Sequence, residues 1–157
     1  MSTFIRDEEF LQKAIDLVRT AKKSIYISTF KLEITSKRRG AKLKEFFDLL
    51  IQKAGEGVDV CILTNRKDNR GHVPDSNAFA LRFLKTTKIK VRHLPNDRIV
   101  HAKVLIVDRK KAILGSHNLS VKSCHNNFEI SCFLSEIVSV TYLACYYEDI
   151  WSTGKDI

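Results

Sequence analysis

Long apolar stretches, closely paired cysteines and an abundance of proline or glycine are all missing from this chain. Its 157 residues include only two prolines and six glycines, too few for long disordered linkers. No apolar run approaches the roughly 20 residues that a membrane span needs, so we expect no stable membrane association. Residues 1–10 carry acids where a secretory leader needs an apolar core, and the sequence therefore predicts a cytoplasmic protein.

Cysteine is sparse as well, and metal-binding patterns are weak. The four cysteines, none in a Cys-x-x-Cys pair, are Cys61, Cys124, Cys132 and Cys145. At this density they do not predict a disulfide framework. Zinc held by Cys124, His125 and Cys132 is a minor alternative, because the spacing matches no standard knuckle. The acidic residues are scattered rather than clustered as in a two-metal nuclease, so we expect neither a metal nor an organic cofactor.

Basic residues are in clear excess. Lys and Arg number 27 against 18 acids, which gives a formal net charge of +9. Such a domain favours polyanionic partners, with nucleic acid first and an anionic membrane surface second. Charge of this kind also serves solubility alone, so the partner must be inferred from the site.

Hydrophobic periodicity predicts helices and strands in alternation. Helical spacing is found over residues 5–20, 41–54 and 135–151, and Ser76 or Asn77 caps a short helix to about Lys85. Strands are expected over 24–30, 58–64, 88–93, 102–108, 111–115 and 128–134, with a turn at 95–97. Strands cluster after the first two-thirds, so the pattern predicts one α/β domain over 1–157, with a mixed β-sheet flanked by helices.

The start of the 102–108 strand carries the most informative residues. In an extended strand, His101 and Lys103 point to one face, which sets a neutral nucleophile or base beside a cation. A lysine on an otherwise apolar strand is hard to explain by structure alone, because burying an unpaired ammonium is costly. Asp108 points to the opposite face and is expected to fix the turn at Arg109 and Lys110.

A second group of polar residues follows the next strand. Gly115 and Ser116, then Asn118, place a small residue and neutral hydrogen-bond donors where an anion can approach. Together with a histidine and a lysine, these groups suit phosphoryl transfer without a metal. The histidine attacks phosphorus, while Lys103 and Asn118 stabilise charge on the non-bridging oxygens. His117 and His125 are expected to be surface residues.

The composite pattern His101-x-Lys103-x4-Asp108, followed by Gly115-Ser116-x-Asn118, resembles the signature of the phospholipase D superfamily. The chain looks most like the small, single-motif bacterial endonucleases of that group. The resemblance implies a phospholipase D-like fold and a covalent phosphohistidine at His101. It also implies an orienting carboxylate at Glu129, eleven residues beyond Asn118.

The resemblance further implies a two-fold homodimer. Members of this superfamily need two His-x-Lys motifs to complete one active site. This chain has one, because no other histidine is followed two residues later by lysine. A second copy must then supply the second His101, giving one site shared by two subunits.

Two basic segments are candidates for binding the phosphate backbone, since both follow strand ends. They are Lys37, Arg38 and Arg39, and Arg66, Lys67 and Arg70. We therefore expect a hydrolase, an endonuclease acting on DNA more readily than on RNA, either alone or as the catalytic part of a larger restriction or defence assembly. The alternatives are a phospholipase or phosphatidyl transferase, and a nucleic-acid-binding module without turnover.

Overall fold

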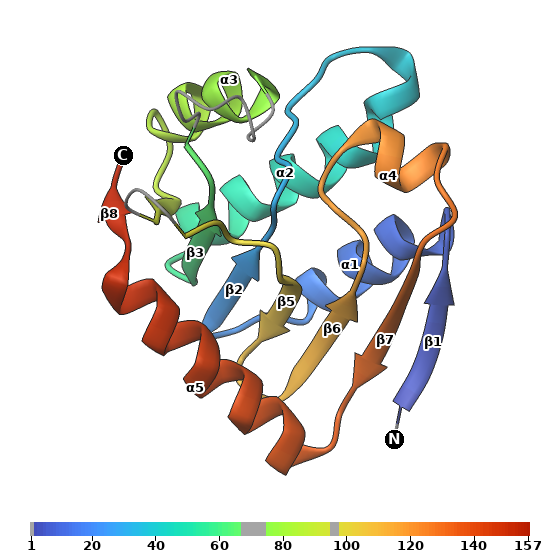
Figure 1. The fold of residues 1–157 in the computed structure, drawn as a ribbon, viewed down its shortest axis with the longest axis vertical. Helices are drawn as coiled ribbons and strands as arrows, with labels where there is room; N and C mark the ends of the chain where they lie inside the picture. Colours follow the sequence, from blue (N-terminus) through green and yellow to red (C-terminus); the bar gives the residue numbers. More distant parts are fainter. Residues whose placement is uncertain (1, 67–74, 95–97) are drawn as a thin grey trace.

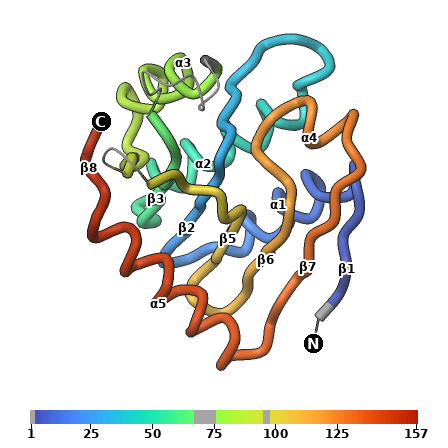
Figure 2. Tube along the Cα trace, in the orientation of Figure 1, coloured from blue at the N-terminus to red at the C-terminus, as the bar shows by residue number. Residues whose placement is uncertain are grey.

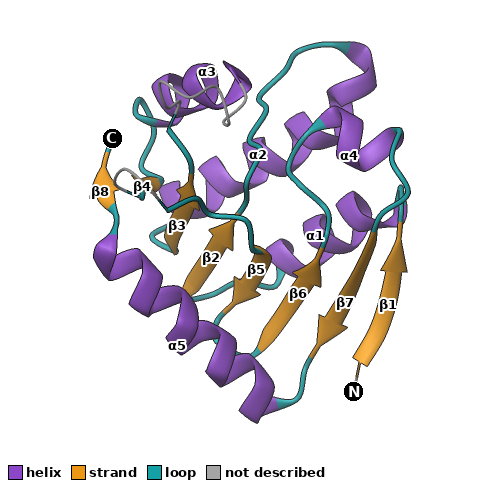
Figure 3. Cartoon of the chain, in the orientation of Figure 1, coloured by secondary structure: helices purple, strands orange, loops and turns teal. Residues whose placement is uncertain are grey.

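The structure is a computed structural model that describes residues 2–66, 75–94 and 98–157. Its described part contains an eight-stranded mixed sheet in the order β1-β7-β6-β5-β2-β3-β4-β8 (Figures 1 and 3). The strands are β1 Ser2–Arg6, β2 Ser24–Ser28, β3 Asp59–Thr64, β4 Lys90–His93, β5 Lys103–Val107, β6 Lys111–Gly115, β7 Ile130–Leu134 and β8 Lys155–Asp156. The helices are α1 Glu9–Arg19, the short 3-10 helix Arg38–Gly40, α2 Ala41–Gly55, α3 Asp75–Leu84, α4 Val121–His125 and α5 Ile137–Thr153. The predicted mixed α/β sheet is confirmed.

Helices cover both faces of the sheet. The helices α1 and α2 pack against one face, and α5 runs diagonally across the other (Figure 1). Central strand β5 shows why its sequence is apolar throughout: Leu105 and Val107 face α1 and α2, whereas Val104 and Ile106 face α5. A strand buried on both sides loses the polar alternation of a surface strand.

The N-terminus differs from the sequence prediction. A helix was expected over 5–20, but residues 2–6 form strand β1, and α1 begins only at Glu9. Ile5 is 2% exposed and pairs with Ser131 of β7, so tertiary pairing overrides the local helical pattern. Asp7 then turns the chain with a positive φ of 44°. The short elements α4, β8 and the 3-10 helix Arg38–Gly40 were not predicted, and the expected turn at 95–97 lies outside the described residues.

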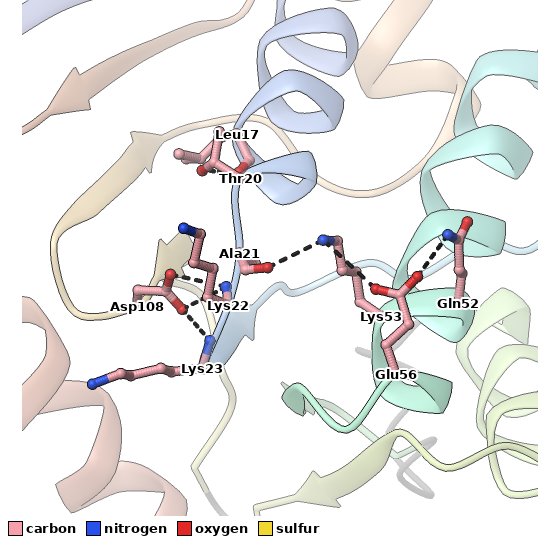
Figure 4. A network of polar contacts seen from close by, with 9 residues as sticks. All are labelled: Leu17, Thr20, Ala21, Lys22, Lys23, Gln52, Lys53, Glu56 and Asp108. Atoms are coloured by element: carbon pink, nitrogen blue, oxygen red, sulfur yellow. Dashed lines mark hydrogen bonds and ion pairs between the residues drawn. The ribbon is translucent and has the colours of Figure 1, made fainter.

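Asp108 fixes a different connection from the one expected. Its carboxylate accepts the backbone N–H groups of Lys22 and Lys23, the shortest at 2.7 Å (Figure 4), and also that of Ser24, and so holds the link between α1 and β2. Burial opposes ionisation here, but these hydrogen bonds prevail and lower the pKa of Asp108. The turn after β5 is instead made by the backbone, since Asp108 and Arg109 have φ values of 54° and 56°. Two left-handed residues give a hairpin loop that matches strand twist.

Candidate active site

The predicted site residues gather at one end of the sheet. Strands β2, β3 and β6 end there, and β5 and β7 begin there (Figure 1). His101 precedes β5, Ser116 and Asn118 follow β6, and Glu129 precedes β7. The segment after β2 and the segment after β6 lie side by side at this end, joined by a bridge between Leu32 and Leu119 (Figure 2).

His101 and Lys103 are in direct contact. The Lys103 Nζ lies 3.1 Å from His101 Nδ1 and donates to the His101 carbonyl oxygen at 2.6 Å. An ammonium has donors only, so Nδ1 accepts. The proton of the neutral His101 ring is therefore on Nε2. His101 is exposed, which leaves that nitrogen open to a reacting group.

Phe30 forms the apolar wall of this pair. Its ring centroid lies 5.4 Å from that of His101, and Lys103 Nζ lies 5.9 Å from the same ring. Burial lowers the pKa of Lys103, while the charge of Glu129 opposes that shift. Phe30 was expected only as a strand residue, but β2 ends at Ser28 and leaves it at the site.

Glu129 is held by a set of hydroxyl and amide donors. Its carboxylate accepts from the hydroxyl of Ser116, from Ser123 Oγ at 2.8 Å and from Asn127 Nδ2 at 3.0 Å. Burial would raise the pKa of Glu129, yet these hydrogen bonds lower it, so the carboxylate stays ionised. Within the described part of the chain it makes no hydrogen bond to His101. Its predicted role of orienting a histidine stays a prediction.

Asn118 is oriented by the segment after β2. Its Oδ1 accepts from the Lys31 backbone N–H at 3.0 Å and from Thr29 Oγ1 at 3.4 Å. Fixing the oxygen in this way fixes the direction of the amide nitrogen. Among the described residues that nitrogen has no acceptor, so it remains available as a donor.

The structure explains the glycine at position 115 differently from the sequence. An added Cβ would lie 2.2 Å from Ser131 Oγ and 2.5 Å from the Ile130 carbonyl oxygen. The residue therefore permits close approach of strand β7, where the sequence suggested close approach of an anion. A side chain here would push apart the strands that carry Ser116 and Glu129.

The expectation for His117 is wrong, because this side chain is buried and structural. It is 2% exposed and stacks on Phe10 with ring centroids 4.4 Å apart. Its Nε2 lies 3.0 Å from the Asp7 carbonyl oxygen, which can only accept, so Nδ1 accepts from Ser131 Oγ at 2.7 Å. Burial lowers the pKa of His117 and keeps the ring neutral. His125 ends α4 and is partly buried, not placed in a loop.

Asp7 is a further residue of the site, and no sequence pattern identified it. Its backbone N–H donates to the Glu129 carbonyl oxygen at 3.1 Å, and its Oδ1 accepts the Glu129 N–H at 2.8 Å. The turn between β1 and α1 thus holds the backbone of Glu129. Because these residues lie 122 apart in the sequence, no local pattern could link them.

The structure describes only some of the basic residues that were proposed to bind the phosphate backbone. Lys37, Arg38 and Arg39 are exposed, and a Cβ added to Gly40 beside them would lie 3.2 Å from a methyl group of Val121 in α4. Arg66 is exposed and lines a hollow of about 420 Å³. Lys67 and Arg70 lie outside the described residues. The hollow is also lined by two basic residues that were not predicted, Arg82 of α3 and Lys85 just after α3.

Two further properties follow from the described residues. None of their histidine, cysteine and acidic side chains form a group of three or more placed to hold a metal ion, and this includes Cys124, His125 and Cys132. No helix among the residues that the structure describes has the length and apolar character needed to cross a membrane.

Comparison with known proteins places the chain among related sequences and folds. The family model for the cardiolipin synthase, PLD-like domain matches residues 14–151. A cardiolipin synthase from Alkalihalophilus pseudofirmus is 36% identical over 92 residues, which are 58% of this chain and 18% of that protein. The chain thus spans about a fifth of the length of this curated relative.

Two of the matching solved structures show the likeness of the fold over the whole chain. The phospholipase D family member Nuc from Salmonella typhimurium superposes with a TM-score of 0.80 at 20% identity, covering 100% of this chain and 99% of Nuc. NucT from Helicobacter pylori gives a TM-score of 0.79 at 19% identity, with the same coverage. At such identities, the likeness concerns the fold.

Proposed function

This chain belongs to the phospholipase D superfamily, and from that membership we propose that it is a phosphodiesterase that cleaves nucleic acid through a phosphohistidine at His101. The observation that carries the proposal is the contact between Lys103 Nζ and His101 Nδ1 at 3.1 Å, at the end of the sheet that also holds Asn118. A nucleophile, a cation and a neutral donor at one end of the sheet are the groups that phosphoryl transfer needs.

In the proposed first step, His101 Nε2 forms a bond to phosphorus while the bond from phosphorus to the leaving oxygen breaks. A second histidine donates its proton to that oxygen. Water then attacks phosphorus and gives its proton to the second histidine, and the phosphorus–nitrogen bond breaks. Lys103 and Asn118 stabilise charge on the non-bridging oxygens throughout.

The single chain supports the need for a second copy. With Nδ1 accepting from Lys103, the neutral His101 ring carries its proton on Nε2. That form can donate a proton, but a nucleophilic Nε2 needs the proton on Nδ1 and an acceptor for it. We propose that Glu129 of a second copy is this acceptor, since it is ionised and makes no described hydrogen bond to His101 of its own chain.

Charge favours nucleic acid as the substrate. The chain carries a net charge of +9, and the exposed basic residues Lys37, Arg38, Arg39 and Arg66 flank the site end of the sheet. The repeated phosphates of a nucleic acid suit an electrostatic surface of this kind.

One observation favours the second candidate function, cleavage or transfer of a lipid phosphodiester. Phe128, next to Glu129, is 100% exposed at the rim of the site. An exposed aromatic side chain can enter a lipid interface. The match to the cardiolipin synthase family model points in the same direction.

Cleavage assays in excess EDTA separate the two candidates and test independence from metals. Wild type, His101→Ala and the control His93→Ala are compared on single- and double-stranded DNA, RNA, and vesicles of phosphatidylcholine and phosphatidylglycerol. We expect nucleic-acid cleavage that survives EDTA, is lost in His101→Ala and persists in His93→Ala. Cleavage of the vesicles alone would replace the nuclease proposal by the lipid candidate. No cleavage by a dimeric wild type would refute both.

A further inference from the structure

A buried asparagine makes hydrogen bonds to the backbone immediately before His101. Asn65 follows β3 and is 3% exposed. Its Oδ1 accepts the Val100 N–H at 2.7 Å, and its Nδ2 donates to the Val100 carbonyl oxygen at 2.9 Å. One side-chain amide therefore satisfies both polar groups of Val100, as a neighbouring strand would do in a sheet.

The same amide also reaches the wall of the site. Asn65 Nδ2 donates to the Phe30 carbonyl oxygen at 3.2 Å, and the Phe30 ring contacts the His101 ring. Asn77 of α3 is 0% exposed and stabilises this contact. It donates to the carbonyl oxygens of Phe30 and Asn65, at 3.0 and 3.1 Å. Asn65 therefore bonds two neighbours of His101, Val100 along the chain and Phe30 across space.

Regular structure does not hold His101 itself. Strand pairing of β5 begins at Lys103, so His101 lies two residues outside the ladder. On its other side, Ser28 Oγ donates to the Ala102 carbonyl oxygen at 3.0 Å. The backbone of His101 is thus fixed at Val100 by Asn65 and at Ala102 by Ser28, through side chains.

We propose that Asn65 is a positioning residue for His101: it fixes the Val100 backbone and the Phe30 wall, so that the imidazole meets phosphorus in line. The proposal rests on the proposed function of His101. Asn65 touches neither substrate nor the reacting atoms and acts through Val100 and Phe30. Displacement of a reacting group by about 1 Å can cost about 100-fold in rate. Loss of the Asn65 hydrogen bonds should therefore lower the rate of the chemical step rather than the affinity for substrate.

The test compares Asn65→Ala and the near-isosteric Asn65→Asp with Tyr147→Phe. The control also loses one buried hydrogen bond, from Tyr147 to the Cys61 carbonyl oxygen at 2.9 Å, but on α5 away from the site. We expect kcat to fall about 30- to 100-fold in Asn65→Ala with KM changed less than threefold. Asn65→Asp keeps the acceptor for the Val100 N–H but loses the donors, so its kcat lies between wild type and alanine. Tyr147→Phe keeps its kcat despite lower thermal stability.

Binding and a spectroscopic readout complete the test. Oligonucleotide affinity is measured in the His101→Ala background with and without Asn65→Ala, and we expect equal affinities. The ring resonances of His101 are recorded by NMR in wild type and in both Asn65 variants, with Tyr147→Phe as reference. This readout needs no turnover, so it separates the two proposals. Suppose that the wild type has no nuclease activity, but that the His101 resonances shift in the Asn65 variants and not in Tyr147→Phe. That result would refute the proposed function and support the positioning role.

Two outcomes would overturn the positioning role. One is a folded Asn65→Ala or Asn65→Asp with wild-type kcat. The other is unchanged His101 resonances in a folded Asn65 variant. If alanine prevents folding, Asn65→Asp decides alone, because it retains the size and the acceptor of asparagine.

Discussion

The ammonium of Lys103 and Nδ1 of His101, 3.1 Å apart, form a pair in which the lysine determines where the histidine carries its proton. The lysine is more than an anchor for phosphate, since in the single chain it occupies the nitrogen that a nucleophilic imidazole must protonate. Substrate and a second copy would both compete for its donors. Several measurable consequences depend on this arrangement.

Replacing Lys103 by methionine separates activity from stability. We expect kcat to fall about 100- to 1000-fold, the range for losing one group that stabilises transition-state charge. Because burial already lowers the pKa of Lys103, removing the charge should leave thermal stability unchanged or raised. Single-turnover cleavage and thermal unfolding check both, with exposed Lys111→Met as the control. A kcat within threefold of wild type would contradict the role given to Lys103.

Mixing subunits tests whether the site is shared. Wild type is co-refolded with a ninefold excess of His101→Ala or, as a control, of His93→Ala. If each site needs two His101 residues, mixed dimers are inactive and activity per wild-type chain falls to about one tenth. The control mixture should show no such loss. Full activity in the His101→Ala mixture would mean that one chain carries a complete site.

His117 predicts an acid-dependent loss of stability. Its pKa is lowered in the folded chain by burial, so below about pH 6.5 the unfolded chain takes up a proton that the folded chain resists. The free energy of unfolding should therefore fall with decreasing pH, by at most about 1.4 kcal/mol per pH unit from this group. Urea unfolding from pH 7.5 to pH 5 should show a flatter pH dependence of the free energy of unfolding for His117→Phe than for wild type. Parallel curves for wild type and His117→Phe would rule out this linkage.

Asp108 predicts an acid-dependent loss of stability of the same sign as that of His117, but at a lower pH. Its pKa is lowered when folded, so its contribution is present above the unfolded value near 3.9 and is lost as pH falls through the folded value. We expect Asp108→Asn to cost about 1–2 kcal/mol at pH 7, since three backbone N–H groups lose a charged acceptor. That difference should shrink below pH 4. The surface variant Asp48→Asn, which only breaks an exposed pair with Lys44, should cost less than about 0.5 kcal/mol.

The sequence predicted what depends on local pattern and missed what depends on distant contacts. Apolar periodicity located the central strands and the long helices, because burial acts on every residue of those segments. Strand alternation correctly put Lys103 beside His101, although His101 itself lies just outside β5. Strand β1 was missed because five residues carry little pattern, and only pairing with β7 makes them a strand.

The polar residues that support the site show the same limit. Nothing near Asn65 or Asp7 in the sequence distinguishes them from ordinary loop residues. Their partners lie 35 and 122 residues away, at Val100 and Glu129. His117 was misjudged for a related reason: it lies between two site residues, but its buried neighbours come from α1 and β7.

The hold of Asp7 on Glu129 has a practical consequence for shortening this protein. The matched family region begins at residue 14, so a fragment trimmed to that boundary keeps every residue of the His101 to Asn118 motif. Yet it discards β1, which pairs with β7, and the turn that binds the Glu129 backbone on both sides. Such a fragment would carry an intact signature and a loosened carboxylate. The functional boundary of the domain therefore lies before the boundary drawn from sequence similarity.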